Sequence, residues 1–372
     1  MRKNRRSLWL IALLLLVAAA GCQRRPLELM YRSTVRVIVK CIWNAEAYPE
    51  GMKPTGVTLY FFRDGEFYSS VTTANVDSCE VELGQGHYKM FMISQSPEEY
   101  WRMEFSDMTS YDKASTYLRE SESNWATRAG ADEKVVENPE VLCAGVADEF
   151  DITDEMTEEY QYYYTNLTKL KAKMADGTKS KAEDIDYYQE RVEYYTIRIP
   201  VYPKNIVSQL WVTVYAGNAD VLKSVRASMS GMARTFELTQ NTTDADEAIQ
   251  LINQWQLTMD SETTRVGHID GIITTFGLPN GETPSAVRDS TLNVSTLLID
   301  NVTTADYKFQ VGDKIKVQTP NRGYRNMYRL IFGTADEPAM ILPDVKPDEG
   351  NKSGMDATVS PWEDGETIEV PM

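Results

Sequence analysis

Apolar and polar residues alternate along the part of the chain that follows the N-terminal segment. In STVRVIVKCIWN every second residue is apolar, and these residues fall on one face of an extended chain: Val35, Val37, Val39, Cys41 and Trp43. An alternation of period two with β-branched side chains is typical of a half-buried strand. Asp64-Gly65 separates two further runs of this kind, and Asp-Gly marks a tight hairpin. Together with SCEVELGQGHYKMFMIS, these short strands predict an antiparallel β-sandwich, which we assign to residues 31–150.

The periodicity changes to that of a helix after residue 150. Thr153 is a candidate N-cap, Asp176-Gly177 is a stop signal, and apolar residues lie three or four positions apart between them: Met156, Tyr160, Tyr163, Leu167, Leu170 and Met174. KAEDIDYYQERVEYY follows as a second helix, so we predict a helical hairpin inserted at residues 151–195. Its tyrosines allow two interpretations, a packing stripe within the hairpin or a surface on which carbohydrate stacks, and the packing stripe is favoured.

The alternation of period two returns after the hairpin. Successive runs such as VSQLWVTVYAG, VGHIDGIITTFGL and STLNVSTLLID are separated by turn signals, including Pro279-Asn280-Gly281. We assign residues 196–372 to a second β-sandwich, with an acidic, proline-rich tail and a closing strand in GETIEVPM. The chain is therefore predicted to be mainly β, with two tandem antiparallel sandwiches and a helical insert between them.

The N-terminal segment has the pattern of an export signal. Four basic residues precede Leu8–Ala20, thirteen apolar residues that are too few to span a bilayer. Ala19-Ala20-Gly21 leads directly into Cys22, an order that resembles a bacterial lipobox. We predict a lipoprotein signal peptide at residues 1–21, acylation of Cys22 as the lipid anchor, and a tether at 22–30. A buried cysteine beside an ordinary cleavage site is the less favoured interpretation.

The net charge limits the classes of partner that the protein can bind. Removal of residues 1–21 takes away four positive charges and no negative ones, which changes the formal charge from −17 to −21. A surface this negative repels phosphate backbones and anionic headgroups, so we predict no nucleic-acid partner. The acylated Cys22 is then the only attachment to the membrane, and we expect the protein in the cell envelope, at the outer membrane, on its periplasmic or its surface face.

Little in the sequence points to catalysis. The two histidines, His87 and His268, have no histidine partner one helical turn away, and neither a nucleophile elbow nor a phosphate-binding loop is present. We therefore predict no catalytic residue, no metal and no cofactor, and a protein that is not an enzyme. Cys41 and Cys79 both occupy apolar positions of strand-like runs, which leaves open a disulfide between them or two separate buried thiols.

Several motifs carry a family resemblance. GVTLYFFRDG followed by VELGQGHYKM resembles the strand, hairpin and turn of transthyretin-like β-sandwich domains. VRASMSGMARTFEL, GIITTFGL and STLNVSTLLIDN, in this order and ahead of YKFQVGDKI, are similar to the second domain of fimbrillin-like lipoproteins of the Bacteroidales. The PEGM turn at residues 49–52 is similar to that of an uncharacterised group of them. The resemblance implies two tandem transthyretin-like domains and a role in the cell envelope, in a fimbria.

Two hypotheses about the function follow, one of an assembly subunit and one of a ligand-binding protein. The favoured one is an anchor or accessory subunit of a fimbria that assembles with fimbrial or other envelope subunits by strand complementation, through an open edge of the second domain. Residues 367–370 are either a participant in this pairing or an internal strand of their own domain. The alternative is a surface glycan-binding lipoprotein. An open edge strand favours assembly, whereas aromatic side chains at loop tips favour glycan binding.

Overall fold

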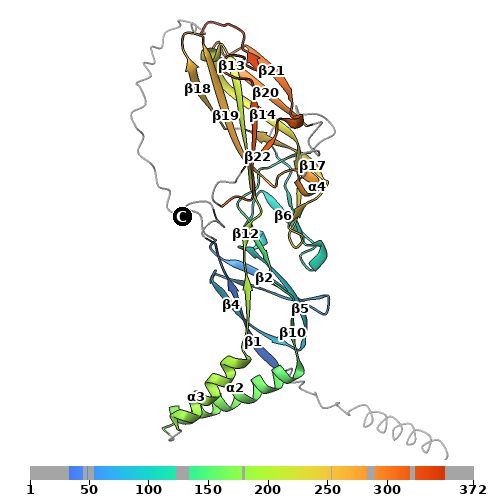
Figure 1. Cartoon of the computed structure of the whole chain (residues 1–372), viewed down its shortest axis with the longest axis vertical. Helices are drawn as coiled ribbons and strands as arrows, with labels where there is room; N and C mark the ends of the chain where they lie inside the picture. Colours follow the sequence, from blue (N-terminus) through green and yellow to red (C-terminus); the bar gives the residue numbers. More distant parts are fainter. Residues whose placement is uncertain are drawn as a thin grey trace, which may run out of the picture. The chain divides into compact units, whose positions relative to one another are not determined.

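The structure is a computed structural model. It describes residues 33–44, 48, 54–122, 134–177, 181–252, 254–282, 290–318 and 323–347. The predicted signal peptide, Cys22, the tether, the PEGM turn and the closing segment 367–370 lie outside these residues. The described chain is mainly β, as the alternation of period two predicts (Figure 1).

Among the described residues, ten strands precede the helical pair. They are β1 (Thr34–Cys41), β2 (Val57–Arg63), β3 (Glu66–Thr73), β4 (Ser78–Gly84), β5 (Gly86–Ser94), β6 (Met103–Ser106), β7 (Ser115–Leu118), β8 (Val135–Val136), β9 (Cys143–Val146) and β10 (Phe150–Ile152). Two short 3-10 turns, η1 (Pro97–Glu99) and η2 (Tyr111–Lys113), lie between them.

The helices and the later strands follow. The helices are α2 (Asp154–Ala175), α3 (Ala182–Tyr195) and the single turn α4 (Pro279–Glu282), with 3-10 turns η4 (Ala219–Val221) and η6 (Gly312–Lys314). The strands are β11 (Ile197–Val201), β12 (Lys204–Asn205), β13 (Ser208–Gly217), β14 (Leu222–Ala233), β15 (Thr235–Glu237), β16 (Thr242–Thr243), β17 (Glu247–Ile252), β18 (Trp255–Ser261), β19 (Val266–Thr275), β20 (Thr291–Leu298), β21 (Thr304–Gln310), β22 (Lys316–Gln318), β23 (Met327–Phe332) and β24 (Met340–Ile341).

The chain forms two compact units. Of the described residues, the first unit comprises those up to Ile38, those in Glu80–His87 and those in Asp151–Arg198, and the second comprises those in Val39–Cys79, in Tyr88–Phe150 and from Ile199 to 347. These units differ from the predicted domain ranges, which divide the chain at 31–150, 151–195 and 196–372.

The first unit is dominated by the helical hairpin. The Thr153 hydroxyl accepts a hydrogen bond from the Met156 N–H at 3.3 Å, which caps the first turn of α2. The helix ends at Ala175, and Gly177 adopts a φ of +77°, a conformation that glycine takes without steric cost. The predicted cap and stop are therefore confirmed. Tyr160 and Leu167, two members of the predicted stripe, are buried.

The tyrosine rings of the hairpin contact one another. The ring centroid of Tyr163 on α2 lies 6.2 Å, 6.1 Å and 5.8 Å from those of Tyr187, Tyr188 and Tyr195 on α3, and the Arg191 guanidinium lies 5.6 Å from it. These distances agree with the interpretation of the tyrosines as a packing stripe, because aromatic pairs at 4.5–7 Å stabilise the contact between two helices.

In the part of the second unit that the structure describes, the strands form four sheets. Their strand orders are β12-β9-β5-β2-β3, β18-β19-β13-β23-β22 with β24 beside β13, β21-β20-β14-β17-β8, and β16-β15-β7-β6. Strands β1, β4 and β11 form a further sheet in the order β11-β1-β4. The predicted hairpin at Asp64-Gly65 joins β2 and β3, and both residues have the positive φ that a tight two-residue turn requires.

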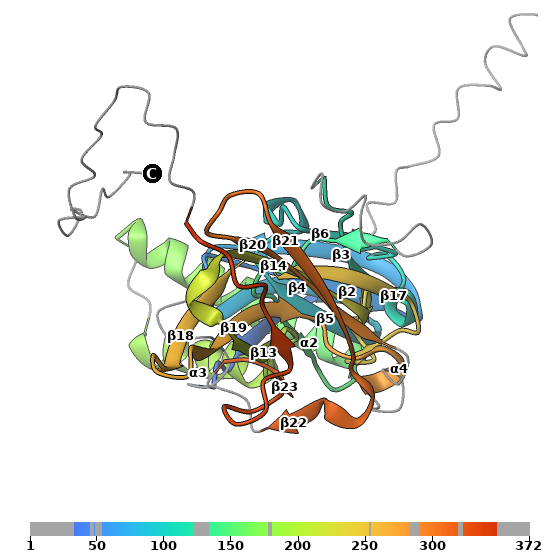
Figure 2. The same ribbon diagram turned by 90° about the horizontal axis from the view of Figure 1, so that it is seen from above.

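Two of these sheets pack face to face around one core. Leu210, Val212 and Val214 of β13 contact a cluster that includes Met229 of β14 and Leu292 of β20, and all five side chains are buried. Figure 2 shows the layer of β13, β18 and β19 against the layer of β14, β20 and β21. This is the sandwich arrangement that the sequence predicts.

Strands from before and after the hairpin share sheets. Strand β7 pairs with β15, β9 with β12, and β8 with β17. A second aromatic core joins Phe62, Phe91, Phe236 and Phe276, which come from both predicted sandwich ranges. The polar stretch 94–138, for which the sequence predicts no element, supplies β6, β7 and β8. Backbone pairing thus links the predicted ranges 31–150 and 196–372. That each range is an independent domain stays a prediction.

Candidate functional site: an open sheet edge

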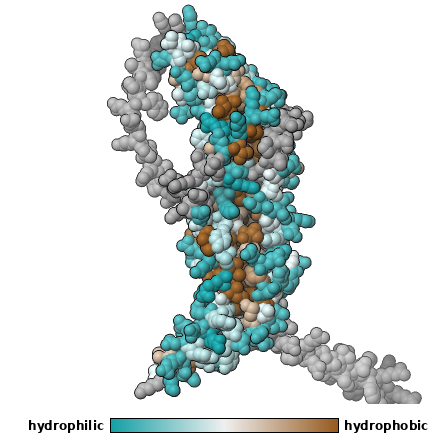
Figure 3. Space-filling view, in the orientation of Figure 1, coloured by the Kyte–Doolittle hydropathy of each residue, from teal (hydrophilic) through white to brown (hydrophobic). Residues whose placement is uncertain are grey.

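The outermost strands of the sheets are the places where another chain can add a strand. In the four sheets of the second unit, the long ones are β3, β18 and β21, with eight, seven and seven residues. An outer strand has one row of backbone N–H and C=O groups that its own sheet does not use. Most of the surface seen in Figure 3 is hydrophilic, so apolar patches do not by themselves single out a binding face there.

Two of these three strands have irregular registers. The pairing of β3 with β2 shifts between Phe61 and Phe62, and that of β18 with β19 shifts between Met259 and Ser261. A shift of this kind bends and twists the outer strand, which is one way in which sheets discourage pairing with other chains.

Strand β21 has a regular register over its whole length. It pairs with β20 without interruption, from Thr291↔Gln310 to Leu297↔Thr304. No described strand pairs with its other side. Among the long outer strands of the second unit's four sheets, β21 is therefore the one whose register has no shift.

The hydrogen bonds at the two ends of β21 determine which of its residues face that edge. The Leu298 N–H donates to the Thr303 carbonyl at 3.0 Å, and the Val311 N–H donates to the Ser290 carbonyl at 2.9 Å. In an antiparallel pair, hydrogen-bonded and non-hydrogen-bonded positions alternate. Residues 303, 305, 307, 309 and 311 therefore direct their backbone groups toward β20. The backbone groups at the open edge belong to Thr304, Asp306, Lys308 and Gln310.

The side chains that face the core hold this edge in place. Tyr307 and Phe309 stack with their ring centroids 6.5 Å apart, and the ring centroids of Phe309 and Phe332 lie 4.8 Å apart. The Tyr307 hydroxyl donates to the Ile341 carbonyl at 2.6 Å. Burial raises the pKa of Tyr307, so its hydroxyl stays protonated and remains a donor.

The outward side chains give the edge a charge pattern. Thr304, Asp306, Lys308 and Gln310 are all exposed, and they place one negative and one positive charge two residues apart. Opposite charges directly across two strands stabilise their pairing, and like charges destabilise it. The edge therefore favours a strand with a basic residue opposite Asp306 and an acidic residue opposite Lys308.

The structure also places the cysteines and histidines that the sequence brings forward. Cys41, Cys79 and Cys143 are buried and form no disulfide, so of the two open arrangements the structure has separate thiols. His87 lies 2.8 Å from Asp151, and His268 lies 2.9 Å from Asp260.

Two further observations concern metals and membranes. Among the described residues, no three or more His, Cys, Asp or Glu side chains gather as they would around a metal ion. No helix in this described part is both long and apolar enough to cross a membrane.

The alternation of polar and apolar residues in the run DYKFQ predicts a strand, but this alternation by itself does not predict an edge. The signal was the polar face of this run, on which Asp306 and Lys308 stand two residues apart. Charged residues at such positions are typical of edge strands.

Comparison with solved structures finds distant likenesses. The chain is similar to a candidate adhesin from Bacteroides ovatus, at 14% identity and a TM-score of 0.49, over 84% of this chain and 94% of the other. It is similar to the fimbrial anchor protein Mfa2 from Porphyromonas gingivalis, at 13% identity and a TM-score of 0.43, over 80% of this chain and 90% of the other. It is also similar to a candidate adhesin from Bacteroides thetaiotaomicron, at 10% identity and a TM-score of 0.44, over 75% of this chain and 81% of the other. With every TM-score below 0.5, these likenesses do not bear on function.

Comparison of the sequence itself gives a firmer result. No curated protein matches the chain. One family model matches residues 21–253, which is more than half of the 372 residues. The chain therefore belongs to the family described as a domain of unknown function, DUF5119.

Proposed function

We propose that this protein is a lipid-anchored component of the cell envelope that acts by assembly, as an anchor or accessory subunit of a fimbria, and that β21 is the edge through which it pairs. The observation that carries the proposal is the regular, open edge of β21. The lipobox pattern at Cys22 and the sequence resemblance to fimbrillin-like lipoproteins support the location and the kind of partner.

The proposed mechanism is the addition of a strand. A partner segment of about seven residues aligns along β21, and its backbone groups pair with those of Thr304, Asp306, Lys308 and Gln310. The backbone bonds supply affinity, and the charges of Asp306 and Lys308 select the register. No catalytic step is part of this function.

A proline at the edge tests the proposal. Lys308→Pro removes one outward N–H and leaves the hydrogen bonds to β20 in place, because the Lys308 backbone groups face away from β20. Lys308→Ala removes the same side chain but keeps the N–H, so it is the matched control. We expect Lys308→Pro to reduce the recovery of crosslinked envelope subunits from native membranes by about tenfold, whereas Lys308→Ala retains most of it.

A second variant guards against misfolding of the proline variant. Lys308→Glu keeps the backbone N–H and places a second negative charge beside Asp306, so it should also weaken capture of subunits. Thermal unfolding checks that each variant is folded. Equal recovery of subunits by the wild type and by folded Lys308→Pro and Lys308→Glu would show that β21 is not the assembly edge.

A further inference from the structure

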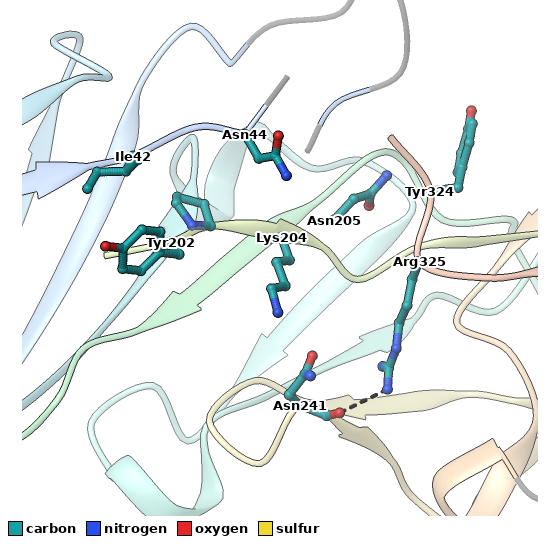
Figure 4. A pocket seen from close by; sticks show the side chains of 9 residues that line it. Ile42, Asn44, Tyr202, Lys204, Asn205, Asn241, Tyr324 and Arg325 are labelled. Atoms are coloured by element: carbon teal, nitrogen blue, oxygen red, sulfur yellow. Dashed lines mark hydrogen bonds between the residues drawn. The ribbon is translucent and has the colours of Figure 1, made fainter. Parts of the chain in front are cut away.

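The second unit has two surface features outside β21, a pocket and the outward face of a sheet. In the pocket the Asn205 side-chain amide donates to the Gly323 carbonyl, and the Arg325 Nη2 donates to the Asn241 carbonyl at 2.9 Å (Figure 4). These polar groups hold the walls of the pocket together. The sheet face differs, because apolar side chains extend from it away from the core.

This outward face belongs to the sheet in which β13 is the central strand, between β19 and β23 (Figure 2). Leu210 and Val212 of β13 are buried in the core. Successive side chains of a strand point to opposite faces, so Trp211 and Thr213 lie on the outward face.

The register of the sheet gives the neighbours of Trp211 and Thr213. Residues that lie opposite each other in a strand pair share one face of the sheet. On the outward face these neighbours are Ile272 and Asp270 of β19, and Arg329 and Ile331 of β23.

The centre of the outward face is apolar. Ile272 is 42% exposed and Ile331 is 47% exposed, and Trp211 on the strand between them is half-buried. A sheet with one solvated face usually carries polar side chains there. An exposed apolar centre around a tryptophan is instead typical of a protein–protein interface.

Charges of opposite sign lie on the two sides of this apolar centre. On one side are Arg329 and Lys316 of the neighbouring β22, and neither forms an ion pair with a residue that the structure describes. On the other side, Asp260 and Asp270 lie 2.9 Å and 3.4 Å from the two ring nitrogens of His268. Two carboxylates share one imidazole, so this side keeps a negative charge even when the imidazole is protonated.

We infer that two copies of this chain pair through the outward face, related by a two-fold axis that lies in the plane of the interface. Such an axis places the basic side of each copy over the acidic side of the other, and packs the two apolar centres together. A second copy carries the complementary pattern by symmetry, which is why the face favours it as the partner.

The two parts of the face have different roles in this pairing. Burial of Trp211, Ile272 and Ile331 supplies affinity. The charges at the sides select the orientation, because like charges placed together oppose any other arrangement. Strand β21 takes no part, since it belongs to another sheet.

Sedimentation of the purified full chain over a range of concentrations tests the inference. We expect a reversible equilibrium between monomer and dimer. Trp211→Glu places a charge in the apolar centre and should weaken dimerisation by about tenfold or more. Arg226→Asp is the control, because Arg226 is exposed on β14 of a different sheet, and it should leave the dimer unchanged.

A mixture of two charge variants tests the two-fold arrangement itself. Arg329→Asp and Asp270→Lys each bring like charges together, so each variant alone should dimerise about tenfold or more weakly than the wild type. An equimolar mixture of the two should recover the dimer, because every charged contact of the mixed dimer then joins opposite charges. Thermal unfolding checks that each variant is folded.

A chain that stays monomeric at every concentration would overturn the inference, as would a dimer that folded Trp211→Glu and Arg329→Asp both retain. Lys308→Pro separates this pairing from strand addition at β21, and we expect it to leave the dimer intact. A dimer that Lys308→Pro abolishes while Trp211→Glu retains it would assign self-association to β21 and overturn the inference too.

Discussion

At the scale of single residues, Gly231 shows why one position in a strand tolerates only glycine. The register of β14 against β17 shifts between Met229 and Met232, and Gly231 there has a φ of +71°. A Cβ at this position would lie 1.9 Å from the Ser290 Oγ. The segment SMSGM, which looks like a fragment of a nucleophile elbow in the sequence, is therefore part of a β-bulge.

We expect Gly231→Ala to reduce the free energy of unfolding by about 2–4 kcal/mol, because it adds a steric clash to an unfavourable φ. Gly177→Ala is the matched control, since Gly177 has a φ of +77° but no atom within 4 Å of its added Cβ, so it should cost only about 1 kcal/mol. Urea unfolding midpoints measure both. Similar losses for the two variants would contradict the role of the Ser290 contact.

The buried thiols make a second prediction at this scale. Burial raises the pKa of Cys41 to about 11, so at pH 8 only about one thiol in a thousand is ionised. Burial also raises the pKa of Cys143. In a Cys22→Ser chain we expect iodoacetamide to leave Cys41 and Cys143 unmodified at pH 8, by mass spectrometry, and to modify both in urea. Rapid modification of the folded chain would contradict this.

At the scale of elements, the helical hairpin and the sheets respond differently to a cut in the chain. The end of α2 is exposed and carries Lys171 and Lys173, so trypsin can reach it. The strand pairs β7·β15, β9·β12 and β8·β17 connect the two sides of such a cut.

We expect limited trypsin digestion to cleave the chain near Gly177 into two β-rich fragments that elute together from a sizing column, because the shared sheets hold them. In urea the fragments should separate. Uncut protein lacking residues 1–21 supplies the reference elution volume. Separation of folded fragments in native buffer would instead mean that residues 31–150 and 196–372 are independent domains, as the sequence predicts.

At the scale of the whole molecule, the lipobox pattern predicts where the protein works. After cleavage only eleven residues, Gln23 to Ser33, separate the predicted anchor from β1, and an extended chain rises about 3.3 Å per residue. The following β domain is therefore expected to lie close to the membrane.

We expect Cys22→Ser to leave the precursor uncleaved and without lipid label, because the thiol is the acylated group. Metabolic labelling with a fatty acid, followed by purification and gel analysis, measures this. Cys143→Ser is the control, since that thiol is buried and should not affect labelling. Lipid label on the Cys22→Ser chain would contradict the predicted anchor.

The sequence by itself determined the local structure. Thr153, the apolar stripe and Gly177 predicted the extent of α2, and Asp64-Gly65 predicted the turn between β2 and β3, since caps and tight turns depend on residues within a few positions of one another. The alternation of period two likewise predicted a mainly β chain of packed sheets.

Tertiary structure decided which strands meet. The run SVRASMSGMARTFEL, one strand in the sequence, is divided between β14 and β15, which belong to different sheets, and β15 pairs with the distant β7. The same holds for both proposed sites. Period two is identical in a central and an outer strand, so it did not reveal that β21 ends its sheet. The outward face joins Trp211, Asp270 and Arg329 from three strands, and only the pairing of the folded chain brings them together.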